Sequence, residues 1–259
     1  MSTAPLRIGT TSFILPDHIL PNVEFLRGKV ADVELLMFES AVSSLPTPKQ
    51  IARLACIANE SGITYTPHLP IDVDCAAATP EVRAHAVATI RSILALTAPL
   101  PVWAYVLHMP AHIACESENC PRERALWQAR STGALKSILA TGLSSRRLCI
   151  ENLEDYRFEV IASVVEDLDL SVCLDIGHLL LQGCDPMAFL ERWRDRVRVV
   201  HLHGVHDGRD HRGLNSLDPR FLREFLSDLA SDSVERVVTI EVFSLDKFQE
   251  SMVVLEDIL

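Results

Sequence analysis

The histidines and carboxylates of this chain occur where they could bind divalent metal. The densest group lies in residues Val199–Leu214, where an apolar run leads into the sequence HLHGVHDGRDHRGL. Burying such side chains costs free energy unless a partner satisfies them. Imidazole nitrogens and carboxylate oxygens are common ligands of divalent cations. The stretch therefore predicts part of a metal site.

Ligand-type residues also close other short apolar runs. Six of them each follow two to four mostly apolar residues: His68, His108, Glu151, Asp175, His201 and Glu241. His178, Asp210 and His211 extend the set. A single histidine at a strand end is more often a hydrogen-bonded core residue, and either aspartate could cap a turn. Glutamate, however, is almost never buried without a partner. Together the nine residues predict a site for two or three metal ions, because one ion would leave most of the histidines without a role.

Eight apolar runs separated by helix-like segments would position these residues. They are Arg7–Phe13, Val33–Glu39, Thr64–Leu69, Trp103–Met109, Leu148–Leu153, Ser171–Ile176, Val197–His203 and Val237–Phe243. The runs are apolar on both faces, as buried strands of a parallel sheet are. Helices are expected to begin at Pro48, Pro80, Pro121, Pro186 and Pro219, because proline is favoured at the first helical position.

The alternation of strands and helices continues without a change in composition. It predicts an α/β fold in which residues 1–259 form a single (β/α)₈ barrel domain. Active sites of this fold gather at the carboxyl ends of the strands, where the predicted ligands lie. The polar stretch Ala111–Cys120 is expected to form a loop over the barrel mouth.

Composition restricts the class of partner. The net charge is −11 and no run of Lys or Arg stands out, so we do not expect a nucleic-acid partner. The seven cysteines are scattered without a CxxC pair, the N-terminus lacks a signal-peptide pattern, and no apolar run reaches the length of a membrane span. We therefore expect a cytoplasmic enzyme that acts on a small molecule away from membranes, of an oligomeric state that the sequence does not indicate.

The predicted ligand set resembles a known superfamily of barrels. Its members include endonuclease IV and the sugar isomerases, and the residues that carry the resemblance are Glu151, Asp175, His178, a histidine of the seventh run, Asp210, His211 and Glu241. In the endonuclease branch, histidines at the positions of His68 and His108 complete sites for up to three metal ions. The resemblance implies that divalent metal ions are the cofactor, with zinc first and manganese or iron as alternatives.

Two departures from the endonuclease pattern affect the ligand assignment. Asp210 and His211 are adjacent here, whereas one residue separates the corresponding pair in that branch. The seventh run ends in His201-Leu202-His203-Gly204, so either histidine could be the ligand. The match to the pattern favours His201, and His203 is then expected to contact substrate.

Two longer stretches are similar to the cobamide-remodelling phosphodiesterases. They are IGTTSFILPDHILPNVEFLRGKVADVELLMFES and VVHLHGVHDGRDHRGLNSLDP. This similarity implies metal-dependent hydrolysis of the phosphodiester in the nucleotide loop of a cobamide, with Glu151 and Glu241 as catalytic carboxylates. A wide corrinoid would need an open apolar mouth, for which Phe13, Ile14 and Met109 are the expected contacts.

Three alternatives stay open. A sugar isomerase or epimerase would bind one ion through Glu151, Asp175, His201 and Glu241, and its two glutamates would exchange protons with a substrate carbon. An endonuclease IV-like nuclease would use the larger ligand set on DNA. A barrel that binds metal or ligand without catalysis is the third.

Overall fold

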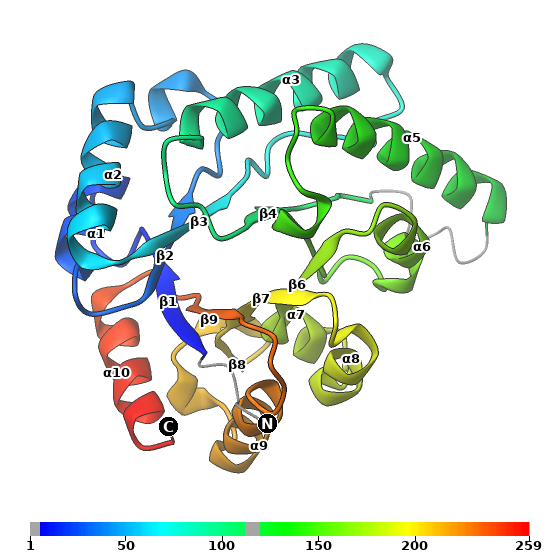
Figure 1. Cartoon of the computed structure of the whole chain (residues 1–259). Coiled ribbons are helices and arrows are strands. Elements are labelled where there is room, and N and C mark those ends of the chain that lie inside the picture. Colours follow the sequence, from blue (N-terminus) through cyan, green and yellow to red (C-terminus); the bar gives the residue numbers. More distant parts are fainter. Residues whose placement is uncertain (1–5, 112–119, 259) are drawn as a thin grey trace.

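A closed barrel of parallel strands forms the centre of the computed structural model, which describes residues 6–111 and 120–258. The strands follow the order β1-β10-β7-β6-β5-β4-β3-β2 around the barrel (Figure 1). They are β1 (Arg7–Thr11), β2 (Asp32–Leu36), β3 (Thr64–His68), β4 (Tyr105–Leu107), β5 (Leu148–Glu151), β6 (Ser171–Asp175), β7 (Val197–Leu202) and β10 (Val237–Ile240). The predicted (β/α)₈ barrel is confirmed.

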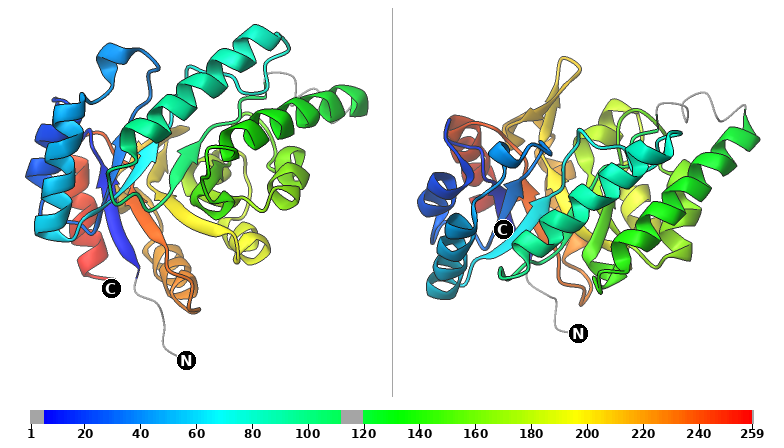
Figure 2. Two further views of the ribbon diagram at one scale, coloured as in Figure 1. Left: turned by 45° about the horizontal axis from the view of Figure 1, so that its top comes forward. Right: turned by 90° about the horizontal axis from the view of Figure 1, so that it is seen from above.

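Helices surround the barrel (Figure 2). They are α1 (Ile19–Leu26), α2 (Pro48–Ser61), α3 (Pro80–Thr97), α5 (Pro121–Leu139), α6 (Glu159–Asp167), α7 (Ile176–Leu181), α8 (Pro186–Trp193), α9 (Pro219–Leu229) and α10 (Leu245–Glu256). The five predicted proline starts are confirmed. Helix α2 shows why the signals work: the Thr47 side chain accepts a hydrogen bond from the backbone N–H of Gln50, and Gly62 ends the helix at φ 75°.

Small apolar side chains fill the barrel interior beneath the strand ends. Ala104, Val106, Cys149, Cys173 and Val199 form this separate buried cluster. The last four lie two residues before His108, Glu151, Asp175 and His201, which lie on the same strands or, for His108, directly after the end of β4. Because side chains two residues apart on a strand point to the same side, the predicted ligands continue these inward rows towards the barrel mouth.

An antiparallel hairpin follows β7 and was not predicted. It pairs β8 (Gly204–His206) with β9 (Arg209–Arg212) and projects from the body of the barrel (Figure 2). Its turn residues Asp207 and Gly208 have φ of 51° and 68°, the left-handed conformation that Asp-Gly favours in tight hairpins. The hairpin brings Asp210 and His211 to the strand ends, which a flexible loop would do less rigidly.

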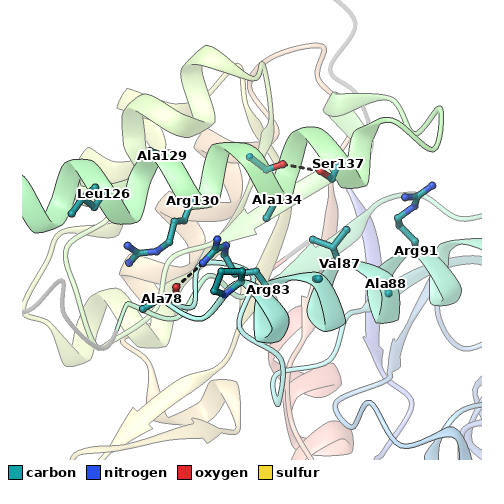
Figure 3. Close-up of a pocket in the computed structure, with 13 residues that line it drawn as sticks. Ala78, Arg83, Val87, Ala88, Arg91, Leu126, Ala129, Arg130, Ala134 and Ser137 are labelled. Atoms are coloured by element: carbon teal, nitrogen blue, oxygen red, sulfur yellow. Dashed lines mark hydrogen bonds between the residues drawn. The ribbon is translucent and has the colours of Figure 1, made fainter.

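Helices α3 and α5 pack against each other and form an open pocket of about 730 Å³ between them (Figure 3). Its lining contains no histidine or carboxylate, and Arg83 and Arg130 donate hydrogen bonds to backbone carbonyls nearby. This pocket is therefore not the site that the sequence predicted. Most of the predicted mouth loop, residues 112–119, lies outside the described residues. No helix in the described part of the chain is long and apolar enough to cross a membrane.

Candidate metal centre

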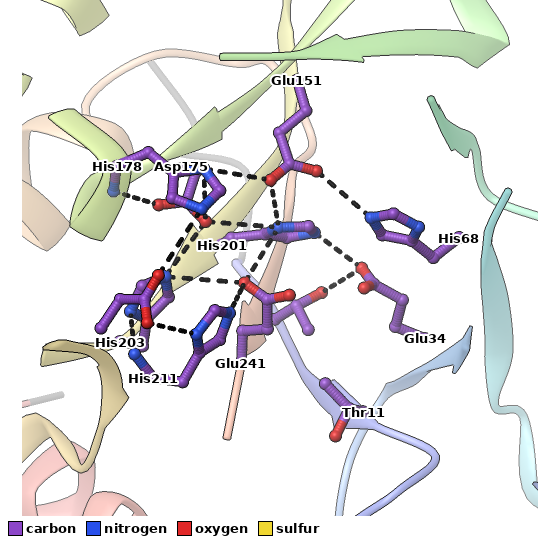
Figure 4. A network of polar contacts seen from close by, with 12 residues as sticks. Thr11, Glu34, His68, Glu151, Asp175, His178, His201, His203, His211 and Glu241 are labelled. Carbon is purple, nitrogen blue, oxygen red and sulfur yellow. Dashed lines mark hydrogen bonds and ion pairs between the residues drawn. The ribbon is translucent and has the colours of Figure 1, made fainter. Parts of the chain in front are cut away.

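The structure brings all nine predicted ligands together at the carboxyl ends of the strands. Figure 4 shows the centre of this cluster around Glu151, His201 and Glu241. The nine residues are His68, His108, Glu151, Asp175, His178, His201, Asp210, His211 and Glu241. Seven of them line a pocket of about 390 Å³, and the other two, Asp175 and His201, are fully buried beneath it. Ion-pair distances of 2.9–3.8 Å connect the set.

Glu151 connects two groups of histidines. Its Oε2 atom lies 3.3 Å from Nε2 of His68 and 3.1 Å from Nε2 of His108. Its Oε1 atom lies 3.4 Å from Nδ1 of His178 and 3.4 Å from Nδ1 of His201. The Glu151 side chain is 1% exposed. A buried carboxylate whose two oxygens both face imidazole nitrogens would hold divalent cations together with these histidines.

Three buried carboxylates converge on one nitrogen of His201. Its Nδ1 atom lies 3.2 Å from Oε2 of Glu241, 3.4 Å from Oε1 of Glu151 and 3.6 Å from Oδ2 of Asp175. Neither this Nδ1 atom nor Oε2 of Glu241 has a hydrogen-bond partner. Buried polar atoms without partners are rare in folded proteins. This donor set, three carboxylates and an imidazole nitrogen, fits a divalent cation.

The neighbouring imidazoles keep the central carboxylates ionised. Burial by itself would raise the pKa of Glu151, but His108 and His201 hold it well below its usual range. Burial would likewise raise the pKa of Asp175, and His203 and His178 lower it to about 2. The carboxylates are therefore charged at neutral pH and available as metal ligands.

A third group of ligands lies nearest to solvent. Nε2 of His178 is 3.3 Å from Oε2 of Glu154 and 3.8 Å from Oδ2 of Asp210. His211 is 2.9 Å from Asp210 through Nδ1 and 3.5 Å from Glu241 through Nε2. His211 has φ 50°. This left-handed backbone conformation is uncommon for residues other than glycine and often marks a functional position.

The contacts of His201 and His203 favour His201 as the metal ligand of strand β7. Nε2 of His201 lies 2.9 Å from Oε2 of Glu34, and both side chains are fully buried. If Nε2 carries the proton, its N–H donates a hydrogen bond to Glu34. The Nδ1 atom then has a free lone pair that faces the cluster, as in carboxylate–histidine–metal arrangements. His203 instead accepts the backbone N–H of His211 at Nδ1, 2.9 Å away, which places its proton on Nε2, 3.0 Å from Asp175.

Two residues at the site were missed from sequence, and three of the four predicted substrate contacts, Ile14, Met109 and His203, are buried. Glu34 and Glu154 touch the cluster but were not singled out; a charged residue inside the apolar run of β2 was the available signal for Glu34. Ile14 and Met109 are 2% and 0% exposed and belong to the hydrophobic core, so their burial argues against the predicted substrate contacts. Phe13 is 49% exposed.

Glu34→Gln should weaken metal binding without removing any ligand. The substitution keeps the shape of the side chain but removes the charge that holds the His201 proton on Nε2, and loss of such a partner costs about 10- to 100-fold in metal affinity. The measurement is competition for zinc with a chelator of known affinity. Glu24→Gln, on the exposed face of α1, is the control. Equal affinities for the two variants would show that Glu34 does not orient His201.

The metal-free protein should lose stability as the pH rises from 6.5 to 9. Burial lowers the pKa of His178, but Asp175 and the other carboxylates nearby raise it to about 9. The pKa of His211 is also raised to about 9, by Glu241 and Asp210 against the effect of burial. A folded-state pKa above the unfolded value gives stability that is complete below about pH 6.5 and is lost towards the folded-state pKa. Calorimetric melting after metal removal checks this, and an unchanged melting temperature would contradict it.

Comparison with known families and structures gives one family and many similar folds. The family model described as xylose isomerase-like TIM barrel matches residues 30–258. No curated protein matches the chain. Among solved structures, a D-tagatose 3-epimerase-like protein is 18% identical with a TM-score of 0.75, covering 97% of this chain and 96% of that one.

Two further structures illustrate the range of the fold. Endonuclease IV from Thermus thermophilus is 22% identical with a TM-score of 0.72, covering 97% of this chain and 99% of that one. The IolI protein, solved with a bound zinc atom, is 11% identical with a TM-score of 0.73 and 98% coverage of both chains. At these identities the likeness concerns the fold and leaves the reaction to be argued from the site.

Proposed function

The chain belongs to the xylose isomerase-like TIM barrel family, and on this premise we propose that it is a metal-dependent phosphodiesterase with more than one ion per chain. The family includes both sugar-converting and phosphodiester-cleaving enzymes, so the choice between these two reactions depends on the site. The observation that carries the proposal is the surplus of ligands beyond the four that one ion needs. His68 and His108 converge on the same oxygen of Glu151.

The surplus is arranged as separate groups around shared carboxylates. Candidate groups of close ligand atoms include His68 with His108 and Glu151, and His178 with Glu151 and Asp175. A single ion at Glu151, Asp175, His201 and Glu241 would leave these histidines without a role. Paired ions suit phosphoryl transfer, because attacking and leaving oxygens both need charge stabilisation. The donor set therefore favours hydrolysis of a phosphodiester.

The chain's own residues would bind and orient the reactants. Bound divalent ions would supply positive charge to the phosphoryl oxygens and acidify water. Glu151 and Glu241 would hold the centre from different parts of the barrel wall, since β7 and β6 lie between β10 and β5. Oε2 of Glu241, which has no hydrogen-bond partner, can accept a hydrogen bond from a water molecule and orient it. The 390 Å³ pocket above the cluster gives a small phosphodiester access.

The specific diester that we propose is the nucleotide-loop phosphodiester of a cobamide. The support is the similarity of the stretches around β1–β2 and β7–β9 to the cobamide-remodelling phosphodiesterases. Incubation of zinc-loaded protein with a cobamide should release a lower-ligand nucleoside and leave the phosphate on the corrinoid. Chelation should stop the reaction. If the cobamide stayed intact while other phosphodiesters were cleaved, the proposed substrate would be wrong and the proposed phosphodiesterase reaction would stand.

A sugar epimerase is the second candidate. The carboxylates of Glu151, Asp175 and Glu241 each lie within 3.6 Å of Nδ1 of His201. These four residues would suffice for a single ion. The two functions differ in metal content, with one ion per chain for the epimerase and two or three for the phosphodiesterase. Elemental analysis of gently purified protein, together with a ketose-conversion assay, separates them. One ion per chain with ketose turnover and no phosphodiester cleavage would assign the epimerase function.

Duplex DNA should be a poor substrate. The net charge of −11 opposes approach of a polyanion, and affinity for duplex DNA depends on Lys and Arg contacts to phosphates. We expect no incision of an abasic duplex at about 150 mM salt under conditions in which a small phosphodiester is cleaved. Tight, salt-sensitive binding and incision of that duplex would place the protein with the endonucleases.

A further inference from the structure

A second pocket adjoins the candidate metal centre. It has a volume of about 380 Å³ and is lined by Phe13, Leu36, Phe38, Glu39, Ser44 and Phe243. Phe38 and Phe243 also line the pocket above the metal ligands. The two pockets therefore share two aromatic walls, and a molecule bound at the cluster can extend directly into the second pocket.

The shared rings pack against histidines of the cluster. The Phe38 ring lies 4.7 Å from the ring of His68 in an edge-on arrangement. The Phe243 ring lies 4.8 Å from the ring of His211. One side of each phenylalanine thus supports the metal centre while the residue also borders the second pocket. Phe13 adds a third ring, which is 49% exposed.

The second pocket offers few polar groups that could form hydrogen bonds with a sugar. Its two polar side chains are already paired, since the Ser44 hydroxyl donates to Oε2 of Glu39. The remaining wall consists of three phenyl rings and Leu36. Aromatic rings pack favourably on one another at centroid distances of about 4.5–7 Å, and exposed apolar surface beside a polar site commonly marks a ligand-binding site. Both features favour an apolar, planar ligand.

We propose that Phe13, Leu36, Phe38 and Phe243 form an aromatic subsite that binds a planar aromatic group on one of the alcohols of the diester. The inference rests on the proposed function for the position of the phosphoryl group. That group would lie over the metal ligands, and the aromatic substituent would extend past Phe38 and Phe243 to stack on Phe13. The subsite selects among phosphodiesters by the size and flatness of this substituent.

The test compares two phosphonates that differ only in the substituent. Zinc-loaded protein is titrated calorimetrically with 1-naphthylmethylphosphonate and with methylphosphonate. The naphthyl probe should bind at least tenfold more tightly, since burying and stacking a ring is worth a factor of about ten or more. Phe13→Ala should weaken binding of the naphthyl probe about tenfold and change that of methylphosphonate little. Phe13→Tyr, which keeps the ring, should restore the preference.

Leu126→Ala is the matched control, because it removes an exposed apolar side chain on α5 that lies outside both pockets. It should change neither affinity. Equal affinities of the wild-type protein for the two probes, weaker binding of both by Phe13→Ala, or no binding of either probe would overturn the proposal. A phosphodiester cleavage assay runs in parallel: selective phosphonate binding without cleavage would uphold the subsite and refute the phosphodiesterase function.

Discussion

Glu151→Gln should abolish stoichiometric metal binding and lower turnover by about 10³-fold, since metal stabilisation of transition-state charge is worth several kcal/mol. Glu151 has the widest set of contacts at the site: its two oxygens face His68 and His108 on one side and His178 and His201 on the other. An amide has nearly the same shape but carries no negative charge and has only one oxygen, so it would be a much weaker ligand of a divalent cation. Elemental analysis and kcat/KM measured on the same preparation test both expectations.

Glu81→Gln is the control for Glu151→Gln. Glu81 is an exposed residue of the first turn of α3 and lines neither pocket at the centre. Its replacement should leave metal content and turnover unchanged. If Glu151→Gln retained full metal content and full activity, Glu151 of β5 would not be a metal ligand and the prediction would be wrong.

Gly177→Ala should disrupt the centre although residue 177 carries no ligand atom. A methyl group on Gly177 would lie 2.0 Å from Cε1 and 2.6 Å from Nδ1 of His203. The His203 ring cannot move away easily, because it is held by Asp175 and by the backbone N–H of His211. Overpacking of this kind costs about 1–3 kcal/mol of stability, and a displacement of about 1 Å at a site costs about 10²-fold in rate.

Gly133→Ala separates this steric effect from the general effect of the substitution. Gly133 lies within α5, and an added methyl group there would meet nothing within 4 Å. Alanine in a helix interior is favoured over glycine by about 1 kcal/mol, so this variant should be slightly stabilised with normal metal content. Chemical unfolding and zinc analysis of both variants decide the matter. Equal stability and equal zinc content would mean that the His203 ring tolerates displacement.

The amino-acid sequence by itself determined the fold and the end of the barrel at which the site lies. Runs that are apolar on both faces must be buried strands, and proline starts mark the helices between them, so the (β/α)₈ barrel follows from local patterns. The placement of ligand residues at the ends of these runs also follows locally. Parallel strands bring their carboxyl ends to one edge, which is why Glu151 on β5 and Glu241 just after β10 could be assigned to one site without knowledge of their distance.

Only the tertiary structure decided which residues contact one another across the barrel. Strand periodicity places His201 and His203 on the same inward face, and the choice between them depends on Glu34, which is 167 residues away in sequence. Spacing likewise could not show that Ile14 and Met109 point into the core while Phe13 remains exposed. Local spacing fixes the face of a strand, but barrel closure and register fix the partners on that face. Those partners determine the histidine tautomers, the imidazoles that each carboxylate faces and the residues of the aromatic wall.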